Sequence, residues 1–258
     1  MGPKIKLSYV LPTFNEVDNL DVLFEQIKQF RKNNFIEFIF IDDNSTDGTF
    51  EYLFNQKDKF NNIRILKRID DKGLSKSIKA GYLISKGEYV VVMDTDGQHE
   101  IQTTKNLLKK IDKEKLDIVI ASRFLKESKF ENFPINRLNL SRFGNLLSRL
   151  SLSKKYSYLT DYMSGCFILK KQSCNKYIKD METNGFKFLY DLLSQSNGNL
   201  KVCELPFLFK RRRSGKSKLN FYNIFLYLFS VINNYFFLIM NNLKINLLMI
   251  YKQYQNKK

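Results

Sequence analysis

Several residue types and motifs are scarce or missing in this sequence. Its 258 residues include no tryptophan, a single histidine and three cysteines, none of them in a CxxC pair. We therefore expect a reducing compartment, no structural zinc and three buried free thiols. No signal peptide is visible before the first strand-like run. The absence of a GxGxxG fingerprint and of a P-loop motif argues against a Rossmann dehydrogenase and a P-loop NTPase.

Acidic residues are also in short supply relative to basic ones. The chain carries 43 lysine and arginine residues against 26 aspartate and glutamate residues, a formal net charge of +17. Such an excess attracts polyanions, so nucleic acid, anionic lipid headgroups and a diphosphate substrate are the candidate partners. The charge is unevenly spread, because residues 210–218 hold six cations and no acid, whereas residues 219–243 hold no charge at all.

The order of predicted elements indicates the fold class. Apolar strand-like runs alternate with segments whose apolar residues recur every three or four positions, which is the helical pattern. Apolar strands separated by helices predict an α/β fold, with a mainly parallel sheet covered by helices on both faces. The predicted strands are 5–11, 35–42, 63–66, 88–94, 117–122, 164–170 and 200–209; the predicted helices include 17–30, 48–60, 73–87 (closed by Gly87), 101–114, 137–150 and 186–196.

Polar clusters follow three of these strands. They are LPTFNE, IDDNSTDGT and MDTDGQHE, and they should meet at one edge, because ligands of parallel sheets bind beyond the carboxyl ends of the strands. Asp94 and Asp96 sit one residue apart, and alternation along a strand points both to the same side. Two carboxylates there suit a hard divalent cation, Mg²⁺ or Mn²⁺, with Gln98 adding a neutral oxygen. Such pairs also occur in ordinary turns and caps, so the motif alone does not decide.

The motifs taken together resemble a known family. LPTFNE, DDNSTDGT, GLSKSIKAGYLISKG and DTDGQ come in the order of family-2 glycosyltransferases of GT-A fold. The resemblance narrows to the dolichol-phosphate (polyprenyl-phosphate) mannosyltransferases and covers about residues 5 to 220, through ASRF, NFPINRLNLSRFGN, TDYMSGCFILKK, GFKFLYDLL and FKRRRSGKSKL. The implied fold is Rossmann-like, with a catalytic domain at 1–219 and a C-terminal amphipathic helical segment at 220–258.

The resemblance also assigns roles to single residues. It implies that Asp94, Asp96 and Gln98 bind the metal and the donor diphosphate. Phe14 stands where the family usually has tyrosine, so a hydroxyl contact is lost while stacking survives. Asp43 contacts the base or the ribose. The whole predicted nucleotide-sugar pocket comprises Pro12, Phe14, Glu16, Ile41, Asp43, Asp94, Thr95, Asp96, Gln98, Arg123, Arg212 and Lys218.

Several arginine and lysine side chains in the second half of the chain are candidate ligands for the phosphates of the donor and of the acceptor. Arg123 follows a strand directly at the ligand edge, where a guanidinium suits bidentate phosphate recognition. Arg137 resembles an acceptor-phosphate ligand of the family, and neighbouring Arg142 competes for that role. Arg212 and Lys218 match the Arg and Lys of a family loop that closes on the donor. The remaining cations of this loop could face anionic lipid.

Asp161 and His99 are further titratable candidates. In related inverting enzymes an aspartate in the region of Asp161 can serve as the general base for an acceptor hydroxyl. A phosphate acceptor, with a second pKa of about 6, is already a nucleophile at pH 7. We therefore interpret Asp161 as structural or as a group that orients an arginine. His99 lies next to the metal motif, and a lone loop histidine is more often simply polar than catalytic.

The uncharged stretch predicts a helix at a membrane surface. Residues 221–240 are long enough to span a bilayer. An amphipathic helix in the membrane interface fits better, because the polar residues fall on one side of a helical projection. A helix in the core or at an oligomer interface is the alternative. The polar residues are Asn220, Asn223, Ser230, Asn233, Asn234 and Asn241.

These observations predict an inverting, metal-dependent glycosyltransferase at the cytoplasmic face of a membrane. The resemblance implies transfer of mannose from GDP-mannose to a dolichyl or polyprenyl phosphate. The partners are then the nucleotide sugar, the lipid phosphate and the membrane surface, with no nucleic acid; a small membrane subunit remains open. Alternatives are a UDP-sugar donor, as in a polyprenyl-phosphate glucosyltransferase, and a non-catalytic basic binding module. The catalytic candidates are Asp94, Asp96, Arg123, Arg137 and Arg212.

Overall fold

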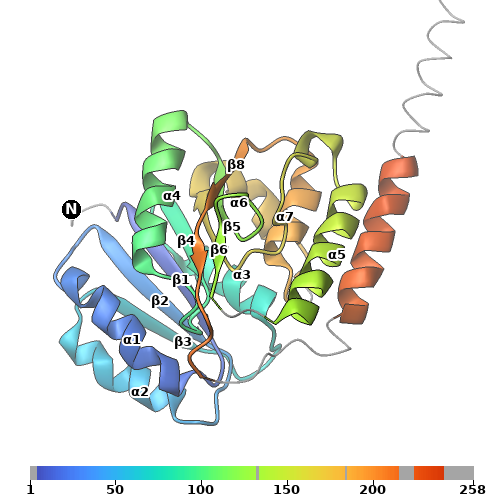
Figure 1. The fold of residues 1–258 in the computed structure, drawn as a ribbon. Coiled ribbons are helices and arrows are strands. Elements are labelled where there is room, and N and C mark those ends of the chain that lie inside the picture. The colour runs from blue at the N-terminus through green and yellow to red at the C-terminus, as the bar shows by residue number, and fades with distance from the viewer. Residues whose placement is uncertain (1–4, 132–133, 184, 215–223, 241–258) are drawn as a thin grey trace, which may run out of the picture.

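A mixed β-sheet of seven strands forms the centre of the protein (Figure 1). The computed structural model describes residues 5–131, 134–183, 185–214 and 224–240. The sheet has the order β3-β2-β1-β4-β7-β5-β8, and β6 and β9 form a separate parallel pair. The strands are β1 (Leu7–Thr13), β2 (Ile36–Asp42), β3 (Ile63–Lys67), β4 (Tyr89–Met93), β5 (Ile118–Ser122), β6 (Lys129–Phe130), β7 (Cys166–Lys170), β8 (Val202–Pro206) and β9 (Leu208–Phe209).

Helices cover both faces of the sheet, which confirms the predicted fold class. Alternation along β4 shows the division, because Val90 and Val92 lie in one apolar cluster and Val91 and Met93 in the other. The Val90 side contains α3 (Leu74–Ile84), α5 (Ile135–Ser151), α6 (Lys171–Asp180) and α7 (Phe188–Ser196); the Val91 side contains α1 (Val17–Ile27), α2 (Thr49–Gln56) and α4 (Ile101–Glu114). Short 3₁₀ turns are η1 (Lys28–Phe30), η2 (Lys57–Lys59) and η3 (Lys154–Tyr156).

The sheet is mainly parallel, as predicted, with one exception. β1 pairs in parallel with β2 and β4, β2 with β3, and β5 with β8. β7 runs antiparallel between β4 and β5. Its first residue, Cys166, therefore pairs with Met93, the last residue of β4. This reversal brings the residues just before β7 to the edge where the polar clusters lie.

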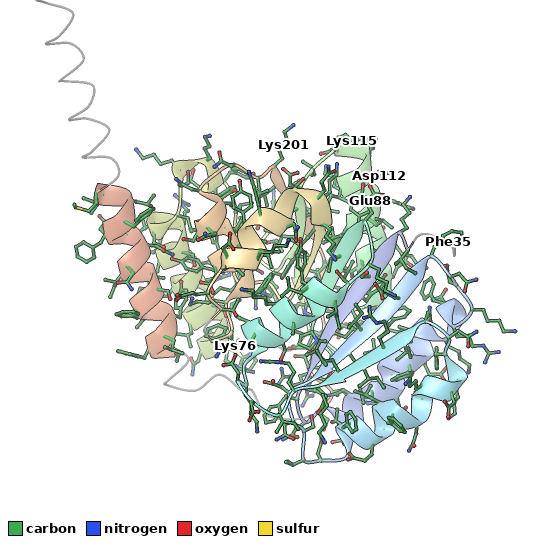
Figure 2. The ribbon with its side chains drawn as sticks, turned by 180° about the vertical axis from the view of Figure 1, so that it is seen from behind. Phe35, Lys76, Glu88, Asp112, Lys115 and Lys201 are labelled. Carbon is green, nitrogen blue, oxygen red and sulfur yellow. The ribbon has the colours of Figure 1, made fainter. Side chains whose placement is uncertain are left out.

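The opposite edge of the sheet is internally paired. Buried Glu37 accepts hydrogen bonds from Ser8 Oγ and from the Lys86 N–H, both at 2.6 Å, and forms an ion pair with Arg64 at 2.9 Å. The buried carboxylate at this edge is thus matched within the protein, and ligands of such sheets bind at the other, carboxyl-end edge. Figure 2 shows Phe35, Glu88, Lys115 and Lys201, each shortly before a strand, along the paired edge, and Lys76 of α3 away from it.

The prediction that Gly87 closes the third helix is wrong. α3 ends at Ile84, and Ser85 is already extended, with φ −63° and ψ 148°. Gly87 lies against β1 instead, where a Cβ atom would come within 2.6 Å of the Ser8 backbone nitrogen. The glycine is therefore required by a close backbone approach and not by a helix cap.

The C-terminal stretch forms a helix at 224–240, which lies beside α5 (Figure 1). Tyr227 is buried in the contact, with its hydroxyl oxygen 2.9 Å from Ser148 Oγ. Asn234 donates to the Tyr190 hydroxyl at 2.9 Å. Within the described ranges no helix has the length and hydropathy to cross a bilayer. The predicted domain boundary at 219/220 falls outside the described residues, as do Asn220, Asn223 and Asn241.

The helix at 224–240 turns polar residues toward the protein and apolar residues outward, the reverse of a helix on a water-facing surface. Ser230 and Asn234 are half-buried on the side that faces the protein, together with buried Tyr227 and Val231. The outward side is apolar; its exposed members include Phe225, Leu228, Phe229, Ile232, Phe236 and Ile239. Part of the predicted polar stripe therefore packs inward, and the apolar side of the helix faces out.

Candidate active site

Three loops meet at the carboxyl-end edge of the sheet, as their polar clusters predict. Asn15 joins the first two, because its N–H donates to Ser45 Oγ at 2.9 Å and its Oδ1 accepts from the Thr46 N–H at 2.9 Å. Thr95 joins the first and third, because its hydroxyl donates to the Pro12 carbonyl oxygen at 3.0 Å. Side chains therefore fix loop to loop at this edge.

Asp94 and Asp96 lie where β4 ends. The Asp94 N–H donates to the Gly165 carbonyl oxygen at 3.1 Å. Its carboxylate packs on the same glycine, where a Cβ atom would lie 2.0 Å from Oδ2, so a larger residue does not fit. Removal from water, and then the charge of Asp96, raise the pKa of Asp94 well above its usual range. A carboxyl group in this position favours a bound proton or a cation.

The two aspartates fit a divalent cation. They present hard oxygen ligands one residue apart, and a cation between them would relieve the repulsion that raises the pKa of Asp94. Across the described part of the chain, no three His, Cys, Asp or Glu side chains gather into a metal-binding group. Two protein carboxylates leave coordination positions for water and phosphate oxygens.

Gln98 has another task in this structure. Its side-chain amide donates through Nε2 to the Lys210 carbonyl oxygen at 3.0 Å, and its backbone N–H donates to Asp96 Oδ1 at 3.1 Å. It therefore ties the aspartate loop to the chain that follows β9. Its predicted role as a metal ligand stays a prediction.

The segment 210–214 lies on the aspartate loop. Arg212 Nη2 forms an ion pair with Asp96 Oδ2 at 2.5 Å, and Ser214 Oγ donates to Asp18 Oδ2 in α1 at 2.8 Å. Burial alone would lower the pKa of Arg212, but the charge of Asp96 outweighs it and raises that pKa. The predicted diphosphate ligand thus lies directly at the candidate metal site. Lys218 lies outside the described residues.

Asp43 is held in place by an arginine that the sequence analysis did not identify. Arg68 Nη1 lies 2.9 Å from Asp43 Oδ1, and the Gly73 N–H donates to Asp43 Oδ2 at 2.7 Å. The same Nη1 donates to Ser77 Oγ at 2.8 Å. Both side chains of the pair are nearly buried, at 12% exposure for Arg68 and 11% for Asp43. The carboxylate is therefore fixed before any ligand binds.

The other predicted nucleotide residues divide between surface and core. Phe14 is 37% exposed, so part of its ring can meet a planar base. Glu16 is buried and accepts from Asn19 Nδ2 at 2.6 Å. Ile41 pairs with Pro12 in the β1–β2 ladder, but its side chain is fully buried. As a side chain, Ile41 belongs to the core.

Arg123 follows β5 and is held by Asp161. Its Nε and Nη2 donate to the two Asp161 oxygens at 2.7 Å each, a bidentate pair. Asp161 is fully buried, and Glu204 of β8 accepts from its N–H at 2.8 Å. Burial alone would lower the pKa of Arg123, but Asp161 raises it. The interpretation of Asp161 as an arginine-orienting group is confirmed, and Nη1 lies outside this pair.

Arg137 and His99 complete the predicted candidates. Arg137 is exposed in the first turn of α5, as is Arg142 farther along, and no described contact joins either to the aspartates. His99 is buried and stacks on Phe207, with ring centroids 5.2 Å apart. Burial lowers the pKa of His99 to about 4, so the ring is neutral at pH 7. His99 is thus an aromatic part of the wall behind the aspartates.

Residues 8–178 match the family model described as glycosyl transferase family 2. The chain belongs to glycosyltransferase family 2. This glycosyltransferase is similar to proteins named dolichol-phosphate mannosyltransferase from Pyrococcus furiosus (35% identity over 226 residues), Mycosarcoma maydis (30% over 238) and Saccharomyces cerevisiae (28% over 229). The matches cover 87%, 89% and 84% of the chain. The chain spans 62% of the length of the Pyrococcus relative and 79% and 82% of the other two.

Solved structures confirm the GT-A fold of this glycosyltransferase. Glucosyl-3-phosphoglycerate synthase from Mycobacterium tuberculosis in complex with UDP matches with a TM-score of 0.67 and 15% identity, over 89% of this chain and 80% of that chain. The complex with Mn²⁺, UDP and glucosyl-3-phosphoglycerate matches with a TM-score of 0.65 and 15% identity, over 89% and 78%. At this identity the likeness bears on the fold alone. The predicted enzyme class and the resemblance to dolichol-phosphate mannosyltransferases are confirmed by the family model and the relatives.

Arg68 and Glu204 support residues of the candidate site, and sequence reasoning missed both. Each had a signal. Arg68 directly follows β3 and so shares the ligand edge with the other polar clusters. Glu204 is an acidic residue inside an otherwise apolar strand, and buried charges are normally paired.

Proposed function

We propose that this glycosyltransferase moves mannose from GDP-mannose to a dolichyl or polyprenyl phosphate with inversion, giving the β-linked lipid-phosphate sugar and GDP. The observation that carries the proposal is that Asp94 and Asp96 share the sheet edge with two guanidinium groups, Arg212 and Arg123, both of which lower the pKa of Asp94 through their charge. Carboxylates for a cation and arginines for phosphates suit two phosphate-bearing substrates. The names of the three relatives support mannose and the lipid phosphate.

The donor would lie on the β1–β4 side of the edge. Asp94 and Asp96 would hold Mg²⁺ or Mn²⁺, which supplies positive charge for the departing diphosphate. Arg212 would exchange its contact with Asp96 for the phosphate oxygens and so add a second positive charge. Asp43, held by Arg68, would bind the base or the ribose, and the Phe14 ring would stack on the base.

The acceptor phosphate would itself be the nucleophile. Its second pKa is about 6, so at pH 7 it needs no general base. One of its oxygens forms a bond to the anomeric carbon while the bond from that carbon to the diphosphate oxygen breaks, and the electron pair leaves with GDP. Arg123, oriented by Asp161, and Arg137 would hold this phosphate in line, because two anions approach each other only between fixed cations.

The reaction would take place at the cytoplasmic face of a membrane. The helix at 224–240 exposes aromatic and aliphatic side chains, and Figure 2 shows its side chains projecting away from the rest of the protein. Neighbouring α5 exposes Phe143, Leu146 and Leu150, with Arg142 and Arg149 exposed on the same helix. Apolar side chains beside arginines suit the boundary between lipid tails and anionic headgroups.

The transfer reaction is tested with labelled sugar and a short polyprenyl phosphate. GDP-mannose and UDP-glucose are supplied in parallel, each with Mn²⁺ and with EDTA. We expect metal-dependent lipid-linked product from GDP-mannose, and loss of that product in Asp94→Asn and Asp96→Asn. Product from UDP-glucose alone would replace the donor, and no lipid-linked product from either would overturn the proposal.

The membrane placement is tested by sedimentation with vesicles that contain phosphatidylserine. Phe229→Glu with Phe236→Glu places two charges on the exposed side of the 224–240 helix, and we expect vesicle binding to fall at least about tenfold. Phe35→Glu with Phe54→Glu is the matched control, because both residues are similarly exposed (57%) but lie outside this helix, just before β2 and in α2. An equal loss in the control, or none in the pair, would contradict the placement.

A further inference from the structure

A cavity of about 100 Å³ opens beside Asp94, on the side of the sheet covered by α3 and α7. Leu74, at its rim, is 36% exposed, so the cavity reaches the carboxyl-end edge. Its walls are mainly apolar and include Ile78, Met163 and Phe186. The polar groups that line it are Asp94, Ser164 and Lys187. A mainly apolar cavity with a few polar groups is the usual form of a small-molecule site.

Lys187 is unusual among the lysines that the structure describes, because only 3% of it is exposed. Its Nζ lies 2.5 Å from Asp191 Oδ1, one turn farther along α7. An ammonium group carries three N–H donors. Among the described residues, Asp191 is the one hydrogen-bond acceptor paired with this group. The ammonium also lies over the Tyr190 ring, 5.7 Å from its centroid, and its remaining N–H groups are suited to a ligand in the cavity that Lys187 lines.

The position of the cavity relates it to the donor. The Gly73 N–H binds Asp43, and the next residues begin α3 and line the cavity through Leu74. The Ser75 N–H donates to the Gly185 carbonyl oxygen at 3.1 Å, which fixes the start of α3 to the chain that leads into Lys187. The cavity thus lies between the Asp43 loop, Asp94 and the start of α7. A group attached to a diphosphate at Asp94 would enter it.

We propose that this cavity takes the hexose of the donor and that Lys187, held by Asp191, donates hydrogen bonds to its hydroxyl groups. A hexose ring has a face of C–H groups for the apolar wall and hydroxyls for the ammonium. Lys187 is then a specificity-determining residue, because a fixed cation distinguishes sugars by the direction of their hydroxyls. The inference rests on the proposed function, and it names the sugar subsite of the same site.

The first experiment measures binding of GDP and of GDP-mannose, with Mn²⁺, by calorimetry. In Lys187→Met we expect the affinity for GDP-mannose to fall about 10- to 100-fold, while the affinity for GDP is unchanged. Lys171→Met is the control, because Lys171 is half-buried and its ammonium group also has a hydrogen-bond partner, which is Ser85, beyond the C-terminal end of α3. It should change neither affinity. The assignment would be overturned if Lys187→Met lowered the affinities for GDP and GDP-mannose equally, or lowered neither.

The second experiment measures selectivity between sugars that differ in one hydroxyl. The ratio of kcat/KM for GDP-mannose over GDP-glucose should fall towards one in Lys187→Met, which a merely structural lysine would not cause. Leu74→Phe fills the cavity mouth and leaves the ion pair intact, so it keeps the test open if Lys187→Met does not fold. This variant should bind GDP-mannose more weakly than the wild type does and bind GDP with the same affinity. An unchanged affinity for GDP-mannose would overturn the assignment.

The two proposals fail in different ways. If the wild-type enzyme transfers mannose and Lys187→Met keeps both affinities and the sugar selectivity, the sugar subsite is wrong and the function stands. If the wild-type enzyme transfers no mannose but binds UDP-glucose more tightly than UDP, and Lys187→Met loses that difference, the subsite stands and the mannose donor is wrong.

Discussion

The two sides of the site each contain a nearly buried aspartate–arginine pair, but the partner that faces the ligand differs. On the donor side the proposed ligand contact is the carboxylate of Asp43, and Arg68 supports it from the end of β3. On the acceptor side the proposed ligand contact is the guanidinium of Arg123, and Asp161 supports it from just before β7. Under the proposed function, one kind of pair would present a negative group to a nucleoside and a positive group to a phosphate.

The geometry of the pairs differs with their task. Asp161 meets Arg123 with both oxygens, and because it is fully buried, neither oxygen is accessible to a ligand. Asp43 meets Arg68 with one oxygen, and a backbone N–H takes the other. The acceptor-side pair thus behaves as a rigid unit, whereas the donor-side pair is distributed over a side chain and a loop. Breaking each pair should show this difference.

The largest effect is expected from Asp161→Asn. The substitution keeps the shape but leaves the Arg123 guanidinium without its counter-charge in a buried place, which costs about 3–5 kcal/mol. We expect the free energy of unfolding, measured with urea, to fall by that amount, and the KM for the lipid phosphate to rise because Arg123 is no longer oriented. The affinity for GDP should be unchanged. A general base at Asp161 would instead lower kcat and leave the acceptor KM intact.

Much of the fold could be predicted from the sequence because its signals are local. Apolar strands and helical periodicity located the elements of the sheet, and α4 was predicted at its observed bounds, 101–114. The antiparallel direction of β7 was not predictable, because it depends on where the chain returns after α5. Gly87 was misread for a related reason. Its constraint is the backbone of β1, which is distant in sequence.

The position of a candidate-site residue was predictable where the residue lies next to a strand end, and less so for the residues that support it. Asp43, Asp94 and Arg123 follow strands and lie at the predicted edge. Arg68 and Glu204 act by contact with residues 25 and 43 positions away, and sequence spacing does not reveal such contacts. The sequence also did not determine which side of the 224–240 helix faces inward. That choice depends on hydrogen bonds from this helix to Tyr190 and to α5.

A third buried pair, Lys187 with Asp191, sharpens the comparison, because a single ammonium contact compensates a carboxylate less well than a bidentate guanidinium. Burial raises the pKa of Asp191 to about 6 although Lys187 lowers it. A folded-state pKa above the unfolded value stabilises the fold at low pH, and this contribution is lost as the pH rises through about 6.

Asp191→Asn removes this titration. We therefore expect the difference in unfolding free energy, variant minus wild type, to increase by about 2 kcal/mol between pH 4.5 and pH 7.5. Urea unfolding at the two pH values measures it. A difference that stays constant with pH would mean that Lys187 compensates the charge of Asp191 fully.

The smallest effect is expected on the donor side, from Arg68→Met. Asp43 loses one support but keeps the Gly73 N–H, so the carboxylate is loosened and not released. We expect the affinity for GDP, measured by calorimetry, to fall about tenfold, since one charge-assisted hydrogen bond contributes about 1.5 kcal/mol, while the acceptor KM is unchanged. Arg64→Met is the matched control, because Arg64 lies in β3, the strand that Arg68 follows, and pairs with Glu37 at the opposite edge. Equal losses of GDP affinity in both variants would show that β3 matters for stability and not for the position of Asp43. A rise in the acceptor KM in Arg68→Met would contradict the division of the site into a donor side and an acceptor side.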